Sequence, residues 1–136
     1  MLTFTIVKPD AVAAGDTGRI LADLEGRGFR IRAMRMVRMT RREAEGFYAV
    51  HRGRPFFDEL TAFMSSGPAV VAVLERENAV PALREAMGAT DPGEADPGTI
   101  RAAYGRSIGR NAIHGSDSEA NAAIEIGYFF PGVELV

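Results

Sequence analysis

The sequence predicts an α+β fold in which a four-stranded antiparallel sheet has helices on one face. The chain has 136 residues, of which 46% are hydrophobic, and this is enough to bury the core of one domain, which we expect to span residues 1–136. Segments with strand-like alternation and segments with helical spacing follow each other along the chain. Two strand–helix–strand halves joined by a pair of helices give the ferredoxin-like arrangement.

The first half of the chain contains two of the expected strands. Residues 3–8, TFTIVK, have the β-branched and aromatic content of a strand. Apolar side chains, among them Ile20 and Leu24, then recur at helical spacing. Residues 29–39, FRIRAMRMVRM, alternate as a second strand. Arg35 interrupts this alternation, so we expect a β-bulge or a sheet edge there.

The second half continues the alternation of helices and strands. Thr40 and Glu43 have the spacing of a capping box, which predicts the start of a helix. The remaining elements are expected, in chain order, as a helix at 55–64, a strand at 68–75, a helix at 77–87, a strand at 111–114 and a helix at 118–130. The irregular stretch 88–100 predicts a long loop, a feature that often carries function. Because helices on one face leave the other face bare, we expect another subunit to cover it.

The composition excludes several classes of protein. Sixteen basic and eighteen acidic residues leave a formal net charge of -2, which argues against a protein held to nucleic acid by bulk charge. The chain has no cysteine, which excludes disulfides and thiolate metal sites and fits a reducing compartment. The start resembles no secretory leader, and no stretch reaches the length of a membrane span. We therefore expect a soluble, cytoplasmic protein with no membrane and no specific nucleic-acid partner.

Lys8 is the only lysine among the 16 basic residues. A general preference for arginine accounts for most of this imbalance. An ammonium group is nonetheless a compact charge with freely rotating donors, whereas a guanidinium group is a planar fork. A single retained lysine therefore suggests a position where a point charge is needed.

His114 lies among small residues in the stretch NAIHGSDS, residues 111–118. Ser116 and Glu119 have capping-box spacing, so Ser116 is the expected N-cap of the C-terminal helix. His114 would then lie beside a helix N-terminus, which favours bound anions and a neutral, nucleophilic imidazole. Gly115 would leave room for a phosphate. A structural histidine bonded to a carbonyl at a strand end is the alternative, and the residues alone leave both open.

The sequence offers little for a metal site built by the protein. It has two histidines and no cysteine, and His51 is expected to be a solvated capping residue at the end of a helix. A divalent ion would therefore arrive on the substrate, as Mg²⁺ held by phosphates. Candidates to bind such phosphates are found near strand ends, on helices and in the long loop: Lys8, Arg84, Thr90 and Arg101. Taken singly, each arginine also fits a solvated surface charge.

The stretch NAIHGSDS resembles the active-site signature of the nucleoside diphosphate kinases. Other motifs similar to that family occur in order along essentially the whole chain: KPDAV at 8–12, FYAVH at 47–51, RPFF at 54–57, SGPAVVAVLE at 66–75, MGATDP at 87–92, PGTIR at 97–101 and EIGYFF at 125–130. Several ordered motifs are far more specific than any one of them.

This resemblance implies the reversible transfer of a γ-phosphoryl group from a nucleoside triphosphate, chiefly ATP, to a nucleoside diphosphate. It implies a ping-pong route through a phosphohistidine at His114, with Ser116 and Glu125 orienting the ring. It further implies Mg²⁺ bound chiefly by nucleotide phosphates, and subunits assembled as hexamers or, in some bacteria, tetramers. The residues that would hold phosphates and ribose hydroxyls are Lys8, Tyr48, Arg84, Thr90, Arg101 and Asn111.

Phe56 would stack on the base, as the same resemblance implies. Stacking without hydrogen bonds to base edges accepts any base, so we expect broad base specificity. One departure is Val50, where the family often has an acidic residue, and it puts in doubt a secondary polar contact near the site.

Two alternatives belong to other functional classes. A ferredoxin-like module could bind RNA with the arginine-rich face of residues 30–38, but such modules stack bases on sheet aromatics, and this face has none. A pseudoenzyme could keep the fold and lose turnover, but every residue carried over from the family motif is present. Both alternatives are therefore disfavoured.

Overall fold

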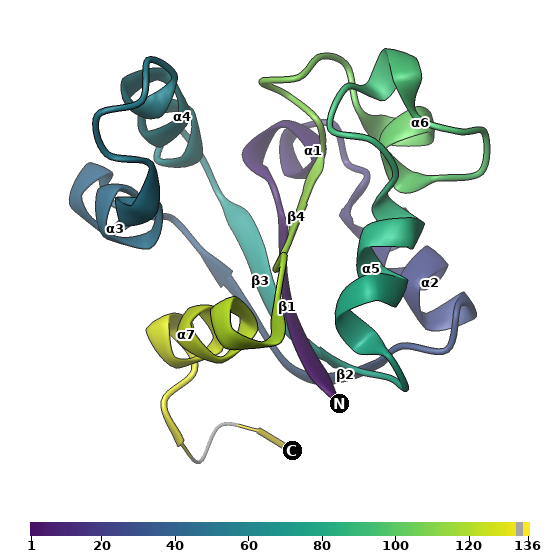
Figure 1. Ribbon diagram of the computed structural model, residues 1–136. Helices are drawn as coiled ribbons and strands as arrows, with labels where there is room; N and C mark the ends of the chain where they lie inside the picture. Colours follow the sequence, from purple (N-terminus) through teal and green to yellow (C-terminus); the bar gives the residue numbers. More distant parts are fainter. Residues whose placement is uncertain (133–134) are drawn as a thin grey trace.

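Four strands form one antiparallel sheet in the order β2-β3-β1-β4, and helices lie on both sides of it (Figure 1). The computed structural model describes residues 1–132 and 135–136. The strands are β1 (Leu2–Val7), β2 (Arg30–Val37), β3 (Ala69–Glu75) and β4 (Ile113–Gly115). The helices are α1 (Pro9–Ala13), α2 (Thr17–Gly26), α3 (Arg41–Phe47), α4 (Phe57–Met64), α5 (Ala79–Met87), α6 (Ile100–Tyr104) and α7 (Glu119–Phe129). The predicted four-stranded antiparallel sheet is confirmed.

The two central strands, β1 and β3, explain why helices are needed on both faces. Thr3 to Val7 in β1 and Ala69 to Leu74 in β3 are all buried. Side chains alternate between the faces of a strand, so an apolar run without interruption must be covered on both sides. The expectation of helices on one face only is therefore corrected.

Each face of the sheet has its own apolar core. On one face, α1, α2, α5 and α6 cover the sheet, with Leu24, Leu83 and Ile100 fully buried. On the other face lie α3, α4 and α7, and Phe4 of β1 stacks on Phe129 with ring centroids 5.7 Å apart. The face that we expected another subunit to cover is thus covered by helices of the same chain.

β2 is an edge strand, as the interrupted pattern suggested, but its irregularity is not at Arg35. The register shifts between Ile31 and Ala33, which pair with adjacent residues of β3. Ile31 packs against one core and Ala33 lies in the other, so the extra residue changes which face the strand presents. Met34 and Met36 on this edge strand are exposed.

The expected long loop between α5 and β4 contains a 3₁₀ turn, Pro92–Glu94, and the short helix α6. Gly88 ends α5 with φ of 84°, and a Cβ added there would lie 2.6 Å from Thr99 Oγ1, so only glycine fits. Arg27 at the end of α2 donates from Nη2 to the carbonyl of Gly98 at 2.5 Å. These contacts fix the two ends of the loop against the helices.

β4 has only three residues and packs closely against α5 through Gly115. A Cβ added at Gly115 would lie 2.7 Å from Met87 Sδ and 2.9 Å from Leu83 Cδ2. The missing side chain therefore makes room for helix α5, and the expectation that it makes room for a phosphate is not supported.

Replacing Gly115 with alanine tests this packing. We expect Gly115→Ala to lower the free energy of unfolding by about 1–3 kcal/mol, because the new methyl overpacks the contact between β4 and α5. Urea denaturation measures the effect.

The matched control is Gly127→Ala in the interior of α7, where an added Cβ meets no described atom within 4 Å apart from its neighbours and the backbone of its own helix. This change should raise the free energy of unfolding by up to about 1 kcal/mol, because alanine has the higher helix propensity. An equal response of the two variants would contradict the packing argument.

Candidate active site

His114 lies in the middle of β4, opposite Ile6 of the central strand. Aromatic side chains surround its ring: the ring centroids of Phe4, Phe47 and Tyr48 lie 6.2, 5.4 and 6.2 Å away, all in edge-on arrangements. The side chain keeps 19% of its surface exposed. The ring is therefore held firmly by packing and still reaches solvent.

Glu125 of α7 fixes the orientation of this ring. His114 Nε2 lies 2.8 Å from Glu125 Oε1, and Ser116 Oγ donates to the same oxygen at 2.8 Å. A carboxylate only accepts hydrogen bonds, so the contact favours the tautomer with the proton on Nε2. The lone pair then lies on Nδ1, which has no hydrogen-bond partner among the described residues.

The N-cap of α7 is Ser118, which corrects the expected cap at Ser116. The Ser118 hydroxyl accepts from the backbone N–H of Asn121 at 3.1 Å, whereas Ser116 is fully buried and bonds Glu125. Asp117 accepts from the Asn121 side chain, and this bond lowers the pKa of Asp117, with a smaller contribution from Arg84. The helix begins at Glu119, so its N-terminus does not directly follow His114 as the sequence suggested.

Lys8, Asn111 and Thr90 form a connected group at the end of β1. Lys8 Nζ donates to Asn111 Oδ1 at 2.9 Å, and Asn111 Nδ2 donates to the carbonyl of Thr90 at 3.0 Å. Lys8 is only 8% exposed. Burial lowers the pKa of Lys8 to about 8; the nearby Arg101 charge adds to this effect and Asp10 opposes it.

Arg101 of α6 is also buried, and it bonds backbone carbonyls rather than standing free for a ligand. Its Nη1 donates to Gly88 at 3.1 Å and its Nη2 to Ile113 at 2.8 Å, so it ties the end of α5 to β4. Its Nε is buried without a partner in residues 1–132 and 135–136. Burial, followed by the charge of Arg84, lowers the pKa of Arg101 to about 10. Arg84 itself is exposed in the last turn of α5.

Tyr48 and Phe56 lie at two ends of an aromatic row that contains His51. The ring of His51 lies 6.3 Å from that of Tyr48 and 5.3 Å from that of Phe56. His51 ends the 3₁₀ turn Ala49–His51 and is half-buried, so it lies at a helix end as expected, and its ring also packs between those of Tyr48 and Phe56. Phe56 is 43% exposed, and Val50 is exposed to solvent, so neither is committed to the core.

The Tyr48 hydroxyl is buried without a partner among the described residues. Burial, followed by the charge of Glu125, raises the pKa of this phenol. The hydroxyl therefore keeps its proton and remains a hydrogen-bond donor.

The backbone just before His114 adopts a conformation that the sequence did not indicate. Ala112 has a positive φ of 73°, and the N–H of Ile113 donates to the carbonyl of Asn111 at 2.9 Å across it. This is a γ-turn, which is rare for a residue with a side chain. It redirects the chain between Asn111 and His114.

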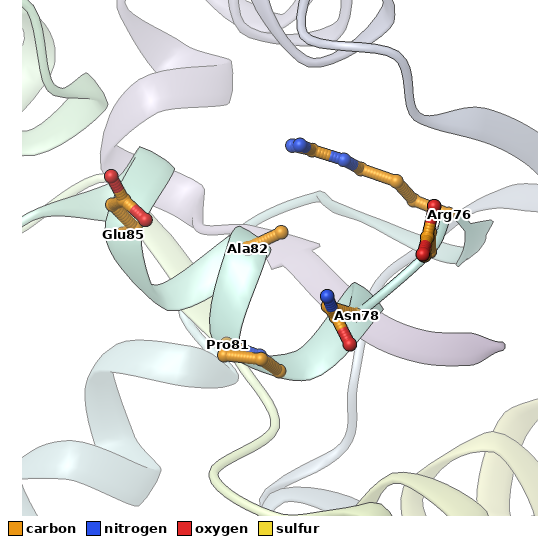
Figure 2. Close-up of a pocket in the computed structure, with 6 residues that line it drawn as sticks. Arg76, Asn78, Pro81, Ala82 and Glu85 are labelled. Atoms are coloured by element: carbon orange, nitrogen blue, oxygen red, sulfur yellow. The ribbon is translucent and has the colours of Figure 1, made fainter.

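A surface hollow of about 300 Å³ lies elsewhere, at the start of α5. Figure 2 shows Arg76 on one side of it and Glu85 on the other, with Asn78 and Pro81 between them. None of the residues brought together around His114 lines this hollow. It is therefore separate from the candidate site.

The site thus combines a histidine whose tautomer is set by Glu125 with two buried cations, Lys8 and Arg101. This combination is suited to binding phosphate groups. The family model for nucleoside diphosphate kinase matches residues 2–135. The chain belongs to the nucleoside diphosphate kinase family. It is accordingly an enzyme, a phosphotransferase that acts on nucleotides.

Relatives and solved structures agree with this assignment over nearly the full length. The chain is 62% identical to a nucleoside diphosphate kinase of Chlamydia abortus, covering 98% of this chain and 95% of that one. The enzyme of Aquifex aeolicus has 51% identity and a TM-score of 0.98, covering 99% and 98% of the two chains. The Halobacterium salinarum enzyme, solved in complex with CDP, has 43% identity and a TM-score of 0.96, covering 100% and 91%.

Two further findings concern metals and membranes. In residues 1–132 and 135–136, no group of three or more histidine, aspartate and glutamate side chains could hold a metal ion. None of the helices that the structure describes is long and apolar enough to cross a membrane.

The lowered pKa of Lys8 predicts how kcat/KM depends on pH. Below about pH 8 the free enzyme carries the Lys8 ammonium, and above it the amine is neutral and loses its attraction for phosphate. We expect kcat/KM, which reports groups of the free enzyme, to fall as the pH rises through about 8. Steady-state rates at low nucleotide concentration between pH 6 and 10 measure this.

Replacing Lys8 with arginine provides the control, because a guanidinium keeps its charge over this range. In Lys8→Arg the fall near pH 8 should disappear, whatever its absolute activity. A wild-type profile that stays flat up to pH 9.5 would contradict the assignment.

Proposed function

We propose that His114 carries the phosphoryl group in a reversible ping-pong reaction. The Nδ1 lone pair attacks the γ-phosphorus of a nucleoside triphosphate, chiefly ATP. The bond from that phosphorus to the β–γ bridging oxygen breaks, and the nucleoside diphosphate leaves. A second nucleoside diphosphate then attacks the phosphohistidine by the reverse route. The observation that carries this proposal is the 2.8 Å contact between Nε2 and Glu125, which in the neutral ring favours the proton on Nε2 and leaves the lone pair on Nδ1.

The cations around the site are proposed to stabilise the transferred phosphoryl group. Phosphoryl transfer passes through a loose transition state, so positioning and charge neutralisation carry the catalysis. Lys8 would follow the moving oxygens as a point charge, and the phenol of Tyr48 would donate to one of them. Arg84, Thr90 and Asn111 would hold the remaining phosphates and the ribose. Arg101 would contribute mainly its charge, because two of its nitrogens already bond carbonyls.

Mg²⁺ is proposed to enter with the nucleotide and to be held chiefly by its phosphates. The donor set fits this view, because cations line the site and the described residues supply no cluster of acidic ligands. When bound, the ion supplies neutralisation of phosphate charge. The residues of the chain supply the orientation of the phosphates and of the histidine.

Broad base specificity is proposed from the environment of Phe56. The ring is 43% exposed, and Arg54 lies over it at 5.7 Å from the centroid. A flat, open aromatic surface accepts any base, because every base has a π face. The CDP bound by the Halobacterium salinarum relative shows that this relative binds a pyrimidine nucleotide.

Assembly and location complete the proposal. We propose a homo-oligomer, a hexamer or a tetramer, supported by the edge strand β2 with its exposed Met34 and Met36. A single domain spanning residues 1–136 is part of the same proposal. The cysteine-free composition supports a cytoplasmic location.

The decisive experiment looks for the covalent intermediate. Enzyme mixed with ATP and Mg²⁺, without an acceptor, should gain the mass of one phosphoryl group, and acid should remove it. In His114→Asn the gain should be absent, because an amide cannot replace the imidazole nucleophile. Intact-protein mass spectrometry makes the measurement. No added group on wild type, or the same group on His114→Asn, would disprove the mechanism.

The lone lysine generates a second prediction. Lys8→Arg should lower kcat at least about tenfold, which corresponds to about 1.4 kcal/mol of transition-state stabilisation, because a planar fork cannot follow the phosphoryl group. The Kd for nucleoside diphosphate should change by less than about threefold, since the charge is kept. Steady-state kinetics and titration calorimetry measure the two quantities. Wild-type turnover in this variant would refute the proposed role.

A further inference from the structure

The turn that precedes His114 is held by a side chain distant in the sequence. Ala112 is fully buried and has φ of 73°, a region that residues with a Cβ rarely adopt. Its N–H donates to Oδ2 of Asp10 at 3.1 Å, and Asp10 lies in the first turn of α1. Its carbonyl accepts from the backbone N–H of Lys8 at 2.8 Å. Both polar groups of Ala112 are thus bonded to the segment that follows β1.

The position of this turn determines what lies on either side of it. On one side, Asn111 presents the amide oxygen that Lys8 Nζ bonds at 2.9 Å. On the other side, Ile113 begins the short strand that carries His114. A relaxation of Ala112 to negative φ would rotate these two neighbours relative to each other. The turn therefore sets the distance between the ammonium of Lys8 and the histidine.

The second oxygen of Asp10 leaves part of the carboxylate charge without a hydrogen bond from the described residues. Oδ1 is buried and has no partner among the described residues. A buried charged oxygen without a donor costs free energy unless its charge is used. The charged groups that act on the Lys8 ammonium are Asp10 from α1 and Arg101 from α6, and Arg84 from α5 acts in turn on Arg101. Asp10 supplies the negative charge that acts on the Lys8 ammonium.

We propose that Asp10 is a positioning residue for phosphoryl transfer: it holds Ala112 in the left-handed turn, aligns His114 with Lys8, and balances the buried cations. Asp10 itself contacts no reacting group. The proposal rests on the proposed phosphorylation of His114. It concerns how the rigid part of the site is maintained before a nucleotide arrives.

The test compares rates of His114 phosphorylation in single turnovers with Mg²⁺ and ATP. Asp10→Ala should slow this step by roughly 10–100-fold, because small misplacements of reacting groups are costly. The Kd for ADP should change by less than about threefold, so that the loss appears in the rate. Asp10→Asn should recover most of the rate at pH 7, since its amide oxygen can accept from Ala112. The control Asp16→Asn, which alters a half-buried carboxylate paired with the exposed Arg19, should behave as wild type.

A double-mutant cycle tests whether Asp10 acts through the turn. Glycine adopts positive φ without penalty, so in an Ala112→Gly background the turn needs its anchor less. The slowing caused by Asp10→Ala should be at least about threefold smaller in that background than in wild type. The same slowing in both backgrounds would overturn the proposal.

The pH profile of Asp10→Asn tests the charge separately and needs only this conservative variant. Loss of the negative charge should move the fall of kcat/KM assigned to Lys8 to lower pH, while Asp16→Asn leaves it in place. An unmoved profile would overturn the charge-balancing role, even if Asp10→Ala failed to fold.

The remaining outcomes separate the two proposals. A phosphorylated wild type, with Asp10→Ala reacting at the same rate, would overturn only the role of Asp10. Equal slowing in Asp10→Ala and Asp10→Asn would overturn the role of Asp10 in holding the turn, because the amide oxygen of Asn can still accept from Ala112. A wild type that forms no phosphohistidine would overturn the proposed function and the role of Asp10 together.

Discussion

The antiparallel pairing of β1 with β4 is the constraint on which the site depends. Ile6 pairs with His114, and the next bond along the ladder joins the N–H of Lys8 to the carbonyl of Ala112. Two segments about a hundred residues apart are thereby placed in one register. β1 is also the centre of the sheet and is buried on both faces, so its position is fixed by two cores. A site built on such a strand needs no mobile segment to assemble it.

The buried cations of the site oppose the stability of the fold. The pKa of Lys8 is about 8 in the folded chain and 10.5 for an ordinary lysine, so between these pH values the unfolded chain binds more protons. Stability therefore rises with pH across this window, whereas the ammonium that attracts phosphate is lost. Nucleotide binding supplies negative charge where the apo chain has repulsion between Lys8 and Arg101. The free energy of nucleotide binding and the free energy of folding therefore both depend on the charges of Lys8 and Arg101.

Much of the fold and part of the site follow from sequence patterns, and the failures have physical causes. Alternation and capping spacing locate the strands and most helices. The uninterrupted apolar runs of β1 and β3 require helices on both faces of the sheet, whereas the predicted ferredoxin-like arrangement has helices on one face only. Ser116 has capping-box spacing to Glu119, but it is buried against Glu125, and Ser118, which lacks that spacing, caps the helix instead. The left-handed Ala112 has no local signal. Its partner Asp10 lies 102 residues away, so one sequence cannot reveal the bond.

The contrast between the two ends of the site bears on specificity. At the phosphate end, Lys8, Arg101 and Asn111 are at most 8% exposed and bonded to one another or to the backbone, so their geometry is fixed before any ligand binds. At the base end, Phe56 is 43% exposed on a short connecting segment. The proposed broad base specificity follows from this contrast, because a rigid, charged phosphate end selects for the polyphosphate and an open aromatic end selects little among bases. In the proposed mechanism, one pocket serves the donor and then the acceptor, and the part that both nucleotides share is the part that the fold holds rigid.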